Sequence, residues 1–388
     1  MKYNWTTKKL SEIAYINPRE SIGKGVVAKK VPMDKLQPFC RDVPEFVLEE
    51  YKGGTKFRNG DTIMARITPC LENGKIAKVS ILSDDEVGFG STEYIVFRAI
   101  DGVSDADFLY YLICSPLIRN PAIKSMVGSS GRQRVQTDVV ANLDIELPPI
   151  EEQRKIGGLL KAIDDKIELN NKINNNLEQQ AKALYKNWFF DFTPFSTDGN
   201  LPNGWRLGTV SDIIQLHDSK RVPLSGAERD KMAKIYPYYG ATSLMDYVDN
   251  YLFDGIYLLL GEDGTVVDSL GFPILQYVYG QFWVNNHAHI ITGKEGFSVE
   301  ELYLFFSLTN IKSIVTGAVQ QKVSQQNLKK VPAIIPSKDA LSAFDELIQP
   351  IFSQIRNLRD ENARLADTRD TLLPKLMSGE LDVSDISL

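Results

Sequence analysis

Residues 150–192 read IEEQRKIGGLLKAIDDKIELNNKINNNLEQQAKALYKNWFFDF. Apolar residues recur in this stretch at alternating intervals of four and three residues. Such spacing, sustained over several heptads, is typical of a coiled-coil seam. A helix of about 40 residues is about 60 Å long, because each residue adds about 1.5 Å. The predicted packing residues of this helix are Ile156, Leu160, Ile163, Ile167, Asn174 and Leu177.

Residues 338–388 repeat the pattern, and an offset of 188 relates the two seams without a gap. A polar Asn at a seam position usually fixes the register of a helix pair and lowers its stability. We therefore expect Asn174 and Asn362 to lie near each other where the helices cross antiparallel. The alternative is a single amphipathic helix on a globular domain. The predicted packing residues of the second helix are Leu341, Ile348, Ile351, Ile355, Asn362 and Leu365.

The repeat extends beyond the helices. At the same offset, Arg134-Val135-Gln136 corresponds to Lys322-Val323-Ser324, and both triplets precede an apolar strand that ends in proline. Trp5 and Trp205 open the two halves at an offset of 200, so insertions separate the two alignments. A repeat this long indicates a duplicated domain. The predicted domains are two regions of mixed structure, residues 1–149 and 193–337, each followed by a helical region, residues 150–192 and 338–388.

The two regions outside the helices are predicted to be rich in β-strand with short helices. Gly-Asp and Asn-Gly turns bound apolar runs at residues 62–67 and 75–82. The predicted fold class is therefore α+β, with two pseudo-repeated mixed domains separated by two long helices packed as an antiparallel coiled coil. Further predicted strands are Gly255–Leu260, Pro273–Val278 and Ala288–Thr292, and further predicted helices are Asp107–Ser115 and Val299–Leu308.

Composition is ordinary for a soluble protein large enough for two domains: 388 residues, 43% hydrophobic and 24% charged. The net charge of −6 is unusual for a nucleic-acid binder, but basic residues cluster in both halves. Residues 119–134 and 312–330 each hold four Lys or Arg and no acid. Three cysteines and the lack of a signal peptide or membrane-spanning run predict a cytoplasmic protein without disulfides.

The common catalytic motifs are missing from the sequence. There is neither a P-loop nor the Asn/Asp-Pro-Pro-aromatic motif of amino-methyltransferases. Asp164-Asp165-Lys166 resembles a nuclease motif only loosely and is better interpreted as a solvated helix face. His287 and His289 have no third metal ligand nearby, so a zinc site is not expected. We predict binding, with no catalytic residues, no metal and no cofactor held by this chain.

Reading DNA sequence requires Arg or Lys for guanine and Asn or Gln for adenine. Two Gly-containing loops at matching places supply such residues, Gly128–Arg134 and Gly317–Lys322. The alternative is that these loops merely cap strands. The DNA-binding candidates in the first half are Arg66, Thr68, Lys75, Ser129, Arg132, Gln133 and Arg134. Those in the second half are Tyr238, Tyr239, Asn285, Asn286, His287, Gln320, Gln321 and Lys322.

The chain resembles the specificity subunits of type I restriction–modification systems. The runs LPPIEEQRKI (residues 147–156) and ALYKNWFFDF (residues 183–192) are similar to the beginning and end of the family's central conserved region. LPNGW (residues 201–205) is similar to the family's opening of its second target-recognition domain, and LPKLMSGEL (residues 373–381) to its C-terminal end. The second half departs from the pattern, because PSKDA (residues 336–340) replaces the Pro-Pro-x-x-Glu-Gln form.

This resemblance implies that each target-recognition domain reads one half of a bipartite, asymmetric site in double-stranded DNA. The helices would set the spacer between the half-sites. Two modification subunits, which bind S-adenosylmethionine, and two restriction subunits, which use ATP and Mg²⁺, would be the protein partners. Alternatives are a nuclease or methyltransferase with its own catalytic domain, a purely structural coiled-coil scaffold, and a silent copy of a specificity gene.

Overall fold

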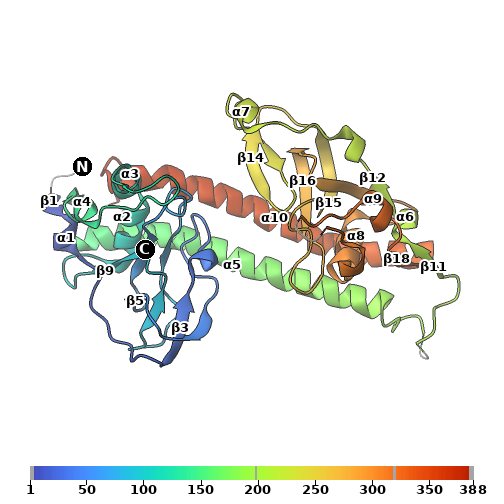
Figure 1. Cartoon of the computed structure of the whole chain (residues 1–388), viewed down its shortest axis with the longest axis horizontal. Coiled ribbons are helices and arrows are strands. Elements are labelled where there is room, and N and C mark those ends of the chain that lie inside the picture. Colours follow the sequence, from blue (N-terminus) through green and yellow to red (C-terminus); the bar gives the residue numbers. More distant parts are fainter. Residues whose placement is uncertain (1–3, 197–198, 318–319, 384–388) are drawn as a thin grey trace. The chain divides into compact units, whose positions relative to one another are not determined.

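The computed structural model describes residues 4–196, 199–317 and 320–383, and its contacts divide the chain into two units. Unit 1 comprises Met1–Asn170 and Asp360–Leu388, and unit 2 comprises Asn171–Arg359. Two helices of 40 residues, α5 (Ile150–Phe189) and α10 (Lys338–Met377), each contribute residues to both units (Figure 1). The two predicted long helices are confirmed. No described helix is long and apolar enough to cross a lipid bilayer.

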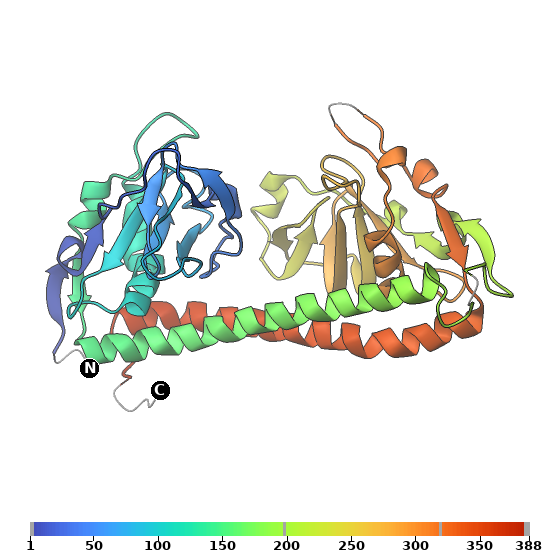
Figure 2. The ribbon, with the colours of Figure 1, turned by 90° about the horizontal axis from the view of Figure 1, so that it is seen from below.

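Unit 1 contains three sheets, which have the strand orders β1-β10, β2-β9-β6-β7 and β4-β3-β8-β5. Their strands are β1 (Thr6–Lys9), β2 (Ala14–Ile16), β3 (Val27–Val31), β4 (Val47–Glu50), β5 (Thr55–Phe57), β6 (Thr62–Ala65), β7 (Ile76–Lys78), β8 (Gly88–Gly90), β9 (Tyr94–Ala99) and β10 (Asp144–Leu147). The short helices are α1 (Leu10–Ile13), η1 (Met33–Lys35), α2 (Ala106–Cys114), α3 (Pro116–Lys124) and α4 (Thr137–Ala141). Figure 2 shows these elements against their segments of α5 and α10.

Unit 2 contains two sheets, which have the strand orders β11-β18 and β12-β17-β15-β16-β13-β14. Their strands are β11 (Arg206–Thr209), β12 (Ile214–Leu216), β13 (Tyr236–Tyr239), β14 (Leu244–Val248), β15 (Phe253–Gly261), β16 (Leu275–Val284), β17 (Ala288–Gly293) and β18 (Pro332–Ile335). The short helices are α6 (Val210–Ile213), η2 (Asp218–Lys220), α7 (Gly226–Arg229), α8 (Val299–Ser307), η3 (Lys312–Ile314) and α9 (Gln325–Leu328). The predicted strands near residues 255, 275 and 288 and the predicted helices at α2 and α8 are confirmed.

The two units share one topology. In each, a strand just after the opening helix pairs antiparallel with the last strand of the main sheet, β2 with β9 and β12 with β17. Each unit also has one parallel strand pair, β3 with β8 in the second four-stranded sheet of unit 1 and β13 with β16 in the main sheet of unit 2. The long strand β16 takes the place that β7 and β8 share in unit 1. The predicted α+β fold with a duplicated, β-rich domain is confirmed.

Within unit 1, the start of α5 and the end of α10 run antiparallel. Asp164 accepts a bond from Arg369 at 2.8 Å, and Asn170 donates to Asn362 at 2.9 Å. The predicted packing residues Ile156 and Leu160 are fully buried, whereas Ile163, Ile167 and Leu365 are partly buried. Antiparallel packing of the predicted seam is therefore confirmed in this unit.

Asp164 does not belong to a solvated face, and that interpretation of the sequence was wrong. Its carboxylate is 5% exposed and also accepts a hydrogen bond from Tyr111 at 2.6 Å. A buried carboxyl group without hydrogen-bond partners is strongly unfavourable, so the bonds from Arg369 and Tyr111 stabilise Asp164 in this position. One of those partners, Arg369, itself occupies a seam position of α10 and lies 205 residues away in sequence.

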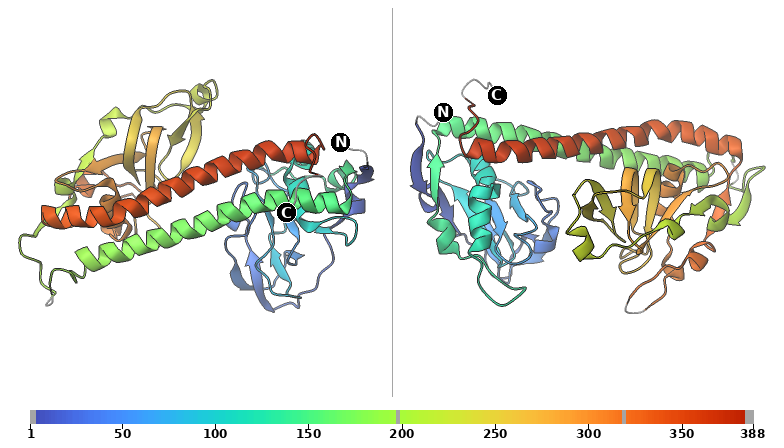
Figure 3. Two further views of the ribbon diagram at one scale, coloured as in Figure 1. Left: turned by 180° about the vertical axis from the view of Figure 1, so that it is seen from behind. Right: turned by 90° about the horizontal axis from the view of Figure 1, so that it is seen from above.

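Within unit 2, the end of α5 and the start of α10 also run antiparallel (Figure 3). Phe344 packs against Tyr185, Trp188 and Phe189, with ring centroids 4.8 to 5.6 Å apart. Aromatic contacts of this kind bury a large apolar area. The predicted packing residues Leu341, Ile348 and Ile355 are buried as well, and Leu177 and Ile351 pack against the same core.

The Glu-Gln pair at the start of α5 connects the helix to the recognition region of unit 1. Gln153 is 1% exposed; its amide donates to the carbonyls of Val103 and Pro148 and accepts from the backbone N–H of Asp105. Glu152 accepts a hydrogen bond from the indole of Trp5 at 3.1 Å. The position equivalent to Gln153 in α10 is Leu341, which is 2% exposed. An apolar contact therefore replaces the amide network where the second half departs from the motif.

Candidate nucleic-acid interface

Loop A (residues 128–133) of unit 1 is closed at its base by two backbone hydrogen bonds. The N–H of Val127 donates to Arg134 O at 3.0 Å, and the N–H of Arg134 donates to Val127 O at 2.9 Å. Two further bonds join this base to the turn after β6. Thr68 N donates to Gln133 O at 3.0 Å, and Val135 N donates to Arg66 O at 2.8 Å. The tip of the loop is thus exposed while its base is held against the sheet.

Loop B (residues 317–321) of unit 2 has the same anchorage, although Ala318 and Val319 lie outside the described residues. Thr316 and Lys322 exchange backbone hydrogen bonds of 2.9 and 2.8 Å. Gly264 N donates to Gln321 O at 3.0 Å, and Val323 N donates to Glu262 O at 2.9 Å. The two Gly-containing loops, predicted from sequence to match, are built on the same hydrogen-bond frame.

The DNA-binding candidates on loop A differ in their exposure to solvent. Ser129 and Arg132 are exposed, and Gln133 is half-buried. Within the described part of the chain, the Arg132 guanidinium makes no hydrogen bond or ion pair. An Arg fork without a protein partner can bind guanine or phosphate without first breaking an internal bond. Arg132 is therefore the cation of loop A best suited to contact DNA.

Arg134 is held by an acid at the loop base. Glu93 accepts from the Arg134 fork through both carboxylate oxygens, at 2.6 and 2.9 Å. Hydrogen bonding and the charge of Arg134 hold the pKa of Glu93 below its usual range. The side chain of Arg66 lies 3.9 Å from the same carboxylate. Arg66 and Arg134 line an open cavity of about 450 Å³ beside loop A.

The side chains of Lys75 and Thr68 contact other residues of unit 1. The ammonium of Lys75 donates to the carbonyl of Met33 at 2.8 Å, and the hydroxyl of Thr68 contacts the sulfur of Met126 at 3.5 Å. Both side chains are partly buried. The structure therefore gives these two candidates a role in holding the neighbouring turns.

Unit 2 gathers three candidates around one open cavity of about 450 Å³. Asn285, His287 and Gln320 line it, together with Asp263, residues 240–243 and Met245. Gln320 and His287 are exposed, as is the neighbouring Asn286. Asn285 is 5% exposed, and its Oδ1 accepts from the N–H of His287 at 2.8 Å. Asn285 thus shapes the turn that presents His287.

Lys322 and Gln321 lie at the base of loop B. The Lys322 ammonium is 3.4 Å from Glu262 and 3.3 Å from Asp263. Gln321 is half-buried. The base of loop B thus repeats the arrangement at the base of loop A, where a cation next to the loop pairs with an acid of the same unit.

Tyr238 is a core residue, and its prediction as a DNA contact was wrong. Its side chain is 2% exposed, lies 4.9 Å under the Arg229 guanidinium and accepts from the N–H of Leu224 at 3.1 Å. The neighbouring Tyr239 is half-buried and packs edge-on against Phe282. The alternation of side chains along β13 places Tyr238 inside, which the run of aromatic residues did not reveal.

Sequence reasoning missed a polar cluster under loop B. Asp218, Glu262 and His289 have ligand-type atoms within 4.8 Å of one another. His289 had been considered only with His287 as a metal ligand. The two histidines do not act together, because His287 is exposed next to Asp263 and His289 is fully buried next to Asp218. The partners lie 71 residues apart, so no local motif signals them.

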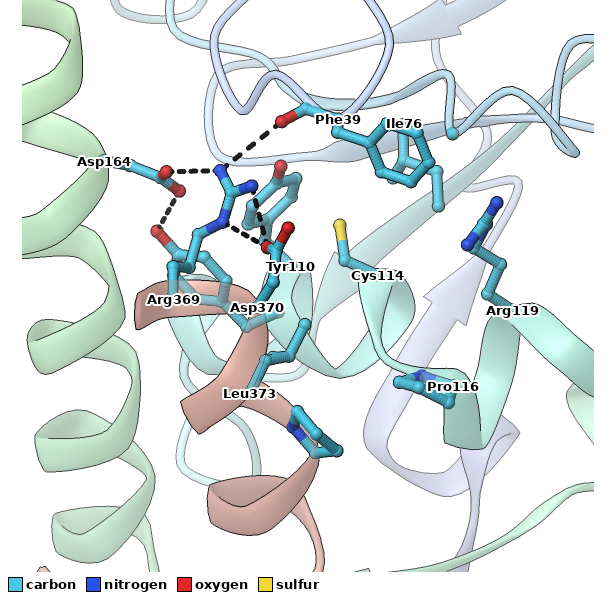
Figure 4. A pocket seen from close by; sticks show the side chains of 13 residues that line it. Phe39, Ile76, Tyr110, Cys114, Pro116, Arg119, Asp164, Arg369, Asp370 and Leu373 are labelled. Carbon is cyan, nitrogen blue, oxygen red and sulfur yellow. Dashed lines mark hydrogen bonds and ion pairs between the residues drawn. The ribbon is translucent and has the colours of Figure 1, made fainter. Parts of the chain in front are cut away.

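A second cavity, of about 250 Å³, lies in unit 1 between the α2–α3 corner and the end of α10 (Figure 4). Arg369 spans one wall, where it bonds to Asp164 and to the carbonyl of Phe39. Arg119 lies over the ring of Phe39 at 5.0 Å. Burial raises the pKa of the Cys114 thiol to about 12, which leaves it unreactive as a nucleophile. The cavity has the composition of a packing defect near the helix end.

Comparison with known proteins agrees with this architecture. A family model described as the type I restriction modification DNA specificity domain matches residues 2–179 and again residues 202–366. The type I restriction enzyme MjaIX specificity subunit of Methanocaldococcus jannaschii is 28% identical over 314 residues, which are 74% of this chain and 71% of that protein. The HindI specificity subunit of Haemophilus influenzae is 24% identical and covers 84% of this chain and 87% of its own length.

The fold comparison points the same way. The type I restriction–modification S subunit of M. genitalium aligns over 96% of both chains with a TM-score of 0.53 at 15% identity, so the fold is shared. The relatives are named as specificity subunits, in accord with the expectation that this chain is not itself an enzyme. Each family match contains one of the two loops on the common frame. The chain therefore belongs to the DNA specificity family of type I restriction–modification systems, with the family's domain present twice.

Proposed function

We propose that this chain reads a bipartite, asymmetric DNA site, with one half-site for each unit. The observation that carries the proposal is the shared frame of loops A and B. The same hydrogen bonds hold both loops, but the exposed residues differ: Arg132 on loop A and Gln320 on loop B. Arg prefers guanine and Gln prefers adenine in the major groove. One frame with different tips is suited to two unlike half-sites.

The charged residues of each loop divide into two classes under this proposal. Arg132 contacts bases or phosphates directly. Arg134 pairs with Glu93 at the base of loop A, and Lys322 pairs with Glu262 and Asp263 at the base of loop B. These two cations fix the loop bases. Contacts that position and contacts that specify are commonly separate in DNA-binding proteins.

The two long helices have a different role in the proposal. Their lengths set the spacer between half-sites, and their outer faces dock two modification and two restriction subunits. S-adenosylmethionine, ATP and Mg²⁺ are bound by those partner subunits. The support is the gapless correspondence of α5 and α10 at an offset of 188, while the recognition regions differ in length and sequence.

The decisive experiment maps methylated adenines by single-molecule sequencing in cells that carry this chain with its modification subunits. We expect one motif with two specific half-sites separated by an unread spacer of fixed length. Cells with the modification subunits alone are the control and should lack the motif. A continuous motif, or methylation that does not depend on this chain, would contradict the proposal.

The salt dependence of DNA binding distinguishes the proposed function from that of a purely structural scaffold. Phosphate contacts release counterions, so the logarithm of the DNA affinity falls linearly with the logarithm of the salt concentration. We expect such a dependence for the complex assembled with this chain. A scaffold without DNA contacts would leave the salt dependence of the modification subunits unchanged.

A further inference from the structure

A buried histidine–aspartate pair, His289 and Asp218, lies next to the base of loop B. His289, in β17, is fully buried. Its Nδ1 is 2.6 Å from Oδ2 of Asp218, and its Nε2 is 2.8 Å from the carbonyl oxygen of Val323. A carbonyl can only accept, so Nε2 donates to Val323. If the Asp218 carboxyl is ionised, Nδ1 must donate too and the ring is an imidazolium.

The surroundings keep Asp218 ionised. Burial raises the pKa of Asp218, but the hydrogen bond and charge of His289, the N–H of Ile290 and the charge of Arg221 together hold it below its usual value. Gln325 donates to the same oxygen at 2.5 Å. The carboxylate therefore has a full set of donors, and the geometry calls for both ring nitrogens of His289 to donate.

This pair is connected to the base of loop B through the backbone. Val323 follows Lys322, the residue that closes the loop, and its N–H donates to the carbonyl of Glu262. His289 thus bonds to the carbonyl of Val323, and Glu262, which directly follows β15, accepts a hydrogen bond from the N–H of Val323. Gln325, two residues further on, begins α9 and is held by Asp218. Both ends of the segment 323–325 are tied to one buried charge pair.

Charged side chains that pair with one another surround the His289–Asp218 pair. Glu262 lies 3.7 Å from His289 Nδ1 and accepts from Arg221 at 2.6 Å. Arg221 also donates to the carbonyl of Ala288 at 2.8 Å. Lys322 faces Glu262 from the solvent side. Because Arg221, Gln325 and His289 already occupy the carboxylate oxygens, we interpret the cluster as an internal network rather than a metal centre.

Both units have an exposed cation paired with an acid at the loop base, and unit 2 has the buried His289–Asp218 contact in addition. In unit 1, Glu93 holds the side chain of Arg134, which is 45% exposed. An exposed ion pair is screened by salt and contributes little, and DNA phosphates can compete for the Arg. In unit 2 the anchor is a buried charge on a backbone carbonyl, which neither salt nor DNA can displace without opening the core.

We propose that His289 is a positioning residue of the second recognition domain. Held by Asp218, its imidazolium fixes the backbone at Val323 and thereby the placement of loop B with Gln320 at its tip. This inference rests on the proposed function. It assigns no DNA contact to His289 itself, which is fully buried.

The protonation state is tested by ¹⁵N NMR on the full chain labelled at its three histidines. We expect one histidine with both ring nitrogens protonated at neutral pH. That signal should vanish in His289→Gln and persist in His217→Gln, the matched control, whose ring contacts Thr292 in the same unit. A neutral His289 ring would overturn the proposal.

The function is tested by mapping methylated adenines with complexes that contain wild-type chain, His289→Gln or His217→Gln. Gln can reach only one of the two acceptors. We expect His289→Gln to relax base preference at one half-site only, by about tenfold, the loss expected when one bidentate base contact is misplaced. The other half-site and the salt dependence of binding should match wild type, and His217→Gln should be unchanged.

Each outcome decides a separate question. If the wild-type complex yields no bipartite motif, the proposed function fails. If it does and His289→Gln reads both half-sites as wild type does, or loses both equally while folded, the positioning role fails. Should circular dichroism show His289→Gln unfolded, Asp218→Asn, which removes the negative charge that holds the His289 ring, decides: relaxation at one half-site supports the role, and an unchanged motif overturns it.

Discussion

The side-chain amide of Asn170 donates to Oδ1 of Asn362 at 2.9 Å, so a polar pair lies on the helix seam of unit 1. Asn170 is fully buried and also donates to Glu361. The offset of 188 maps this pair onto Leu358 and Asn174 in unit 2. Oδ1 of Asn174 is buried without a hydrogen-bond partner among the described residues. Asn362 is thus bonded to Asn170 within unit 1, and unit 2 holds a buried amide oxygen of Asn174 without a partner among the described residues. The expected proximity of Asn174 and Asn362 stays a prediction.

Replacing Asn170 and Asn362 by Leu, singly and together, should show strong coupling. Each single variant removes one of the two groups of the Asn170–Asn362 hydrogen bond, whereas the double variant removes both. We expect an interaction free energy of about 0.5–3 kcal/mol in urea unfolding, in the direction that makes the double variant less destabilised than the sum. Additive effects would contradict the paired arrangement.

Asn174→Leu should stabilise unit 2. The change removes a buried acceptor that has no donor and adds an apolar seam residue, which we expect to raise the free energy of unfolding by about 1 kcal/mol. The control is Asn175→Leu, since Asn175 is exposed on the same helix. An unchanged urea midpoint for Asn174→Leu, or an equal gain in the control, would argue against the unpaired oxygen.

Glu301 in α8 makes unit 2 sensitive to alkaline pH. Burial raises the pKa of Glu301 to about 8, because Ser298 satisfies only part of the carboxyl and Asp345 adds a like charge. A raised folded-state pKa means that the protonated form favours folding. The stability it contributes is complete below pH 4.5, the ordinary value, and is lost as the pH rises toward about 8.

Glu301→Gln should therefore unfold at a higher temperature than wild type at pH 9 and at a similar temperature at pH 5. We expect a difference on the order of 3 kcal/mol at pH 9, after allowance for partial solvation. Calorimetry across this pH range measures it. Glu346→Gln, at an exposed position of α10, is the control; a variant whose pH profile parallels wild type would show that Glu301 is ionised without penalty.

Arg132→Ala should weaken DNA binding more than removal of an exposed cation elsewhere in unit 1. Loss of a base contact costs about 1–3 kcal/mol at one position of one half-site, and loss of a phosphate contact lowers the salt slope by about 1. Fluorescence anisotropy with a duplex carrying the mapped site distinguishes the two. Lys24→Ala, at another exposed position, should bind as wild type, and equal effects of both would remove Arg132 from the interface.

Deleting residues 171–177 of α5 together with the corresponding residues 359–365 of α10 should shorten the DNA spacer. One heptad shortens a helix by about 10 Å, which corresponds to about three base pairs. Methylation mapping should show the same half-sites with the shorter spacer. A variant that retains the wild-type spacer would reject a role of the helices in setting it.

The sequence alone determined the features that repeat along the chain. Heptad spacing reports a helix seam through neighbouring residues, so α5, α10 and the family were identified without coordinates. The offset of 188 also placed loops A and B at equivalent positions, since insertions lie elsewhere. Local pattern was less informative within the β-rich regions, where Tyr238 was assigned to the surface but lies in the core.

Only the tertiary structure decided which charged groups are partners. The bonded partners are far apart in sequence: 41 residues separate Glu93 from Arg134, 71 separate Asp218 from His289, and 205 separate Asp164 from Arg369. Periodicity can place a residue on a face, but it carries no information about which distant segment covers that face. The structure therefore shows that Asp164, predicted to lie on the surface, and His289, without a predicted partner, are buried and hydrogen-bonded. It also distinguishes Arg134 and Lys322, which hold the loop bases, from Arg132, which is exposed on loop A.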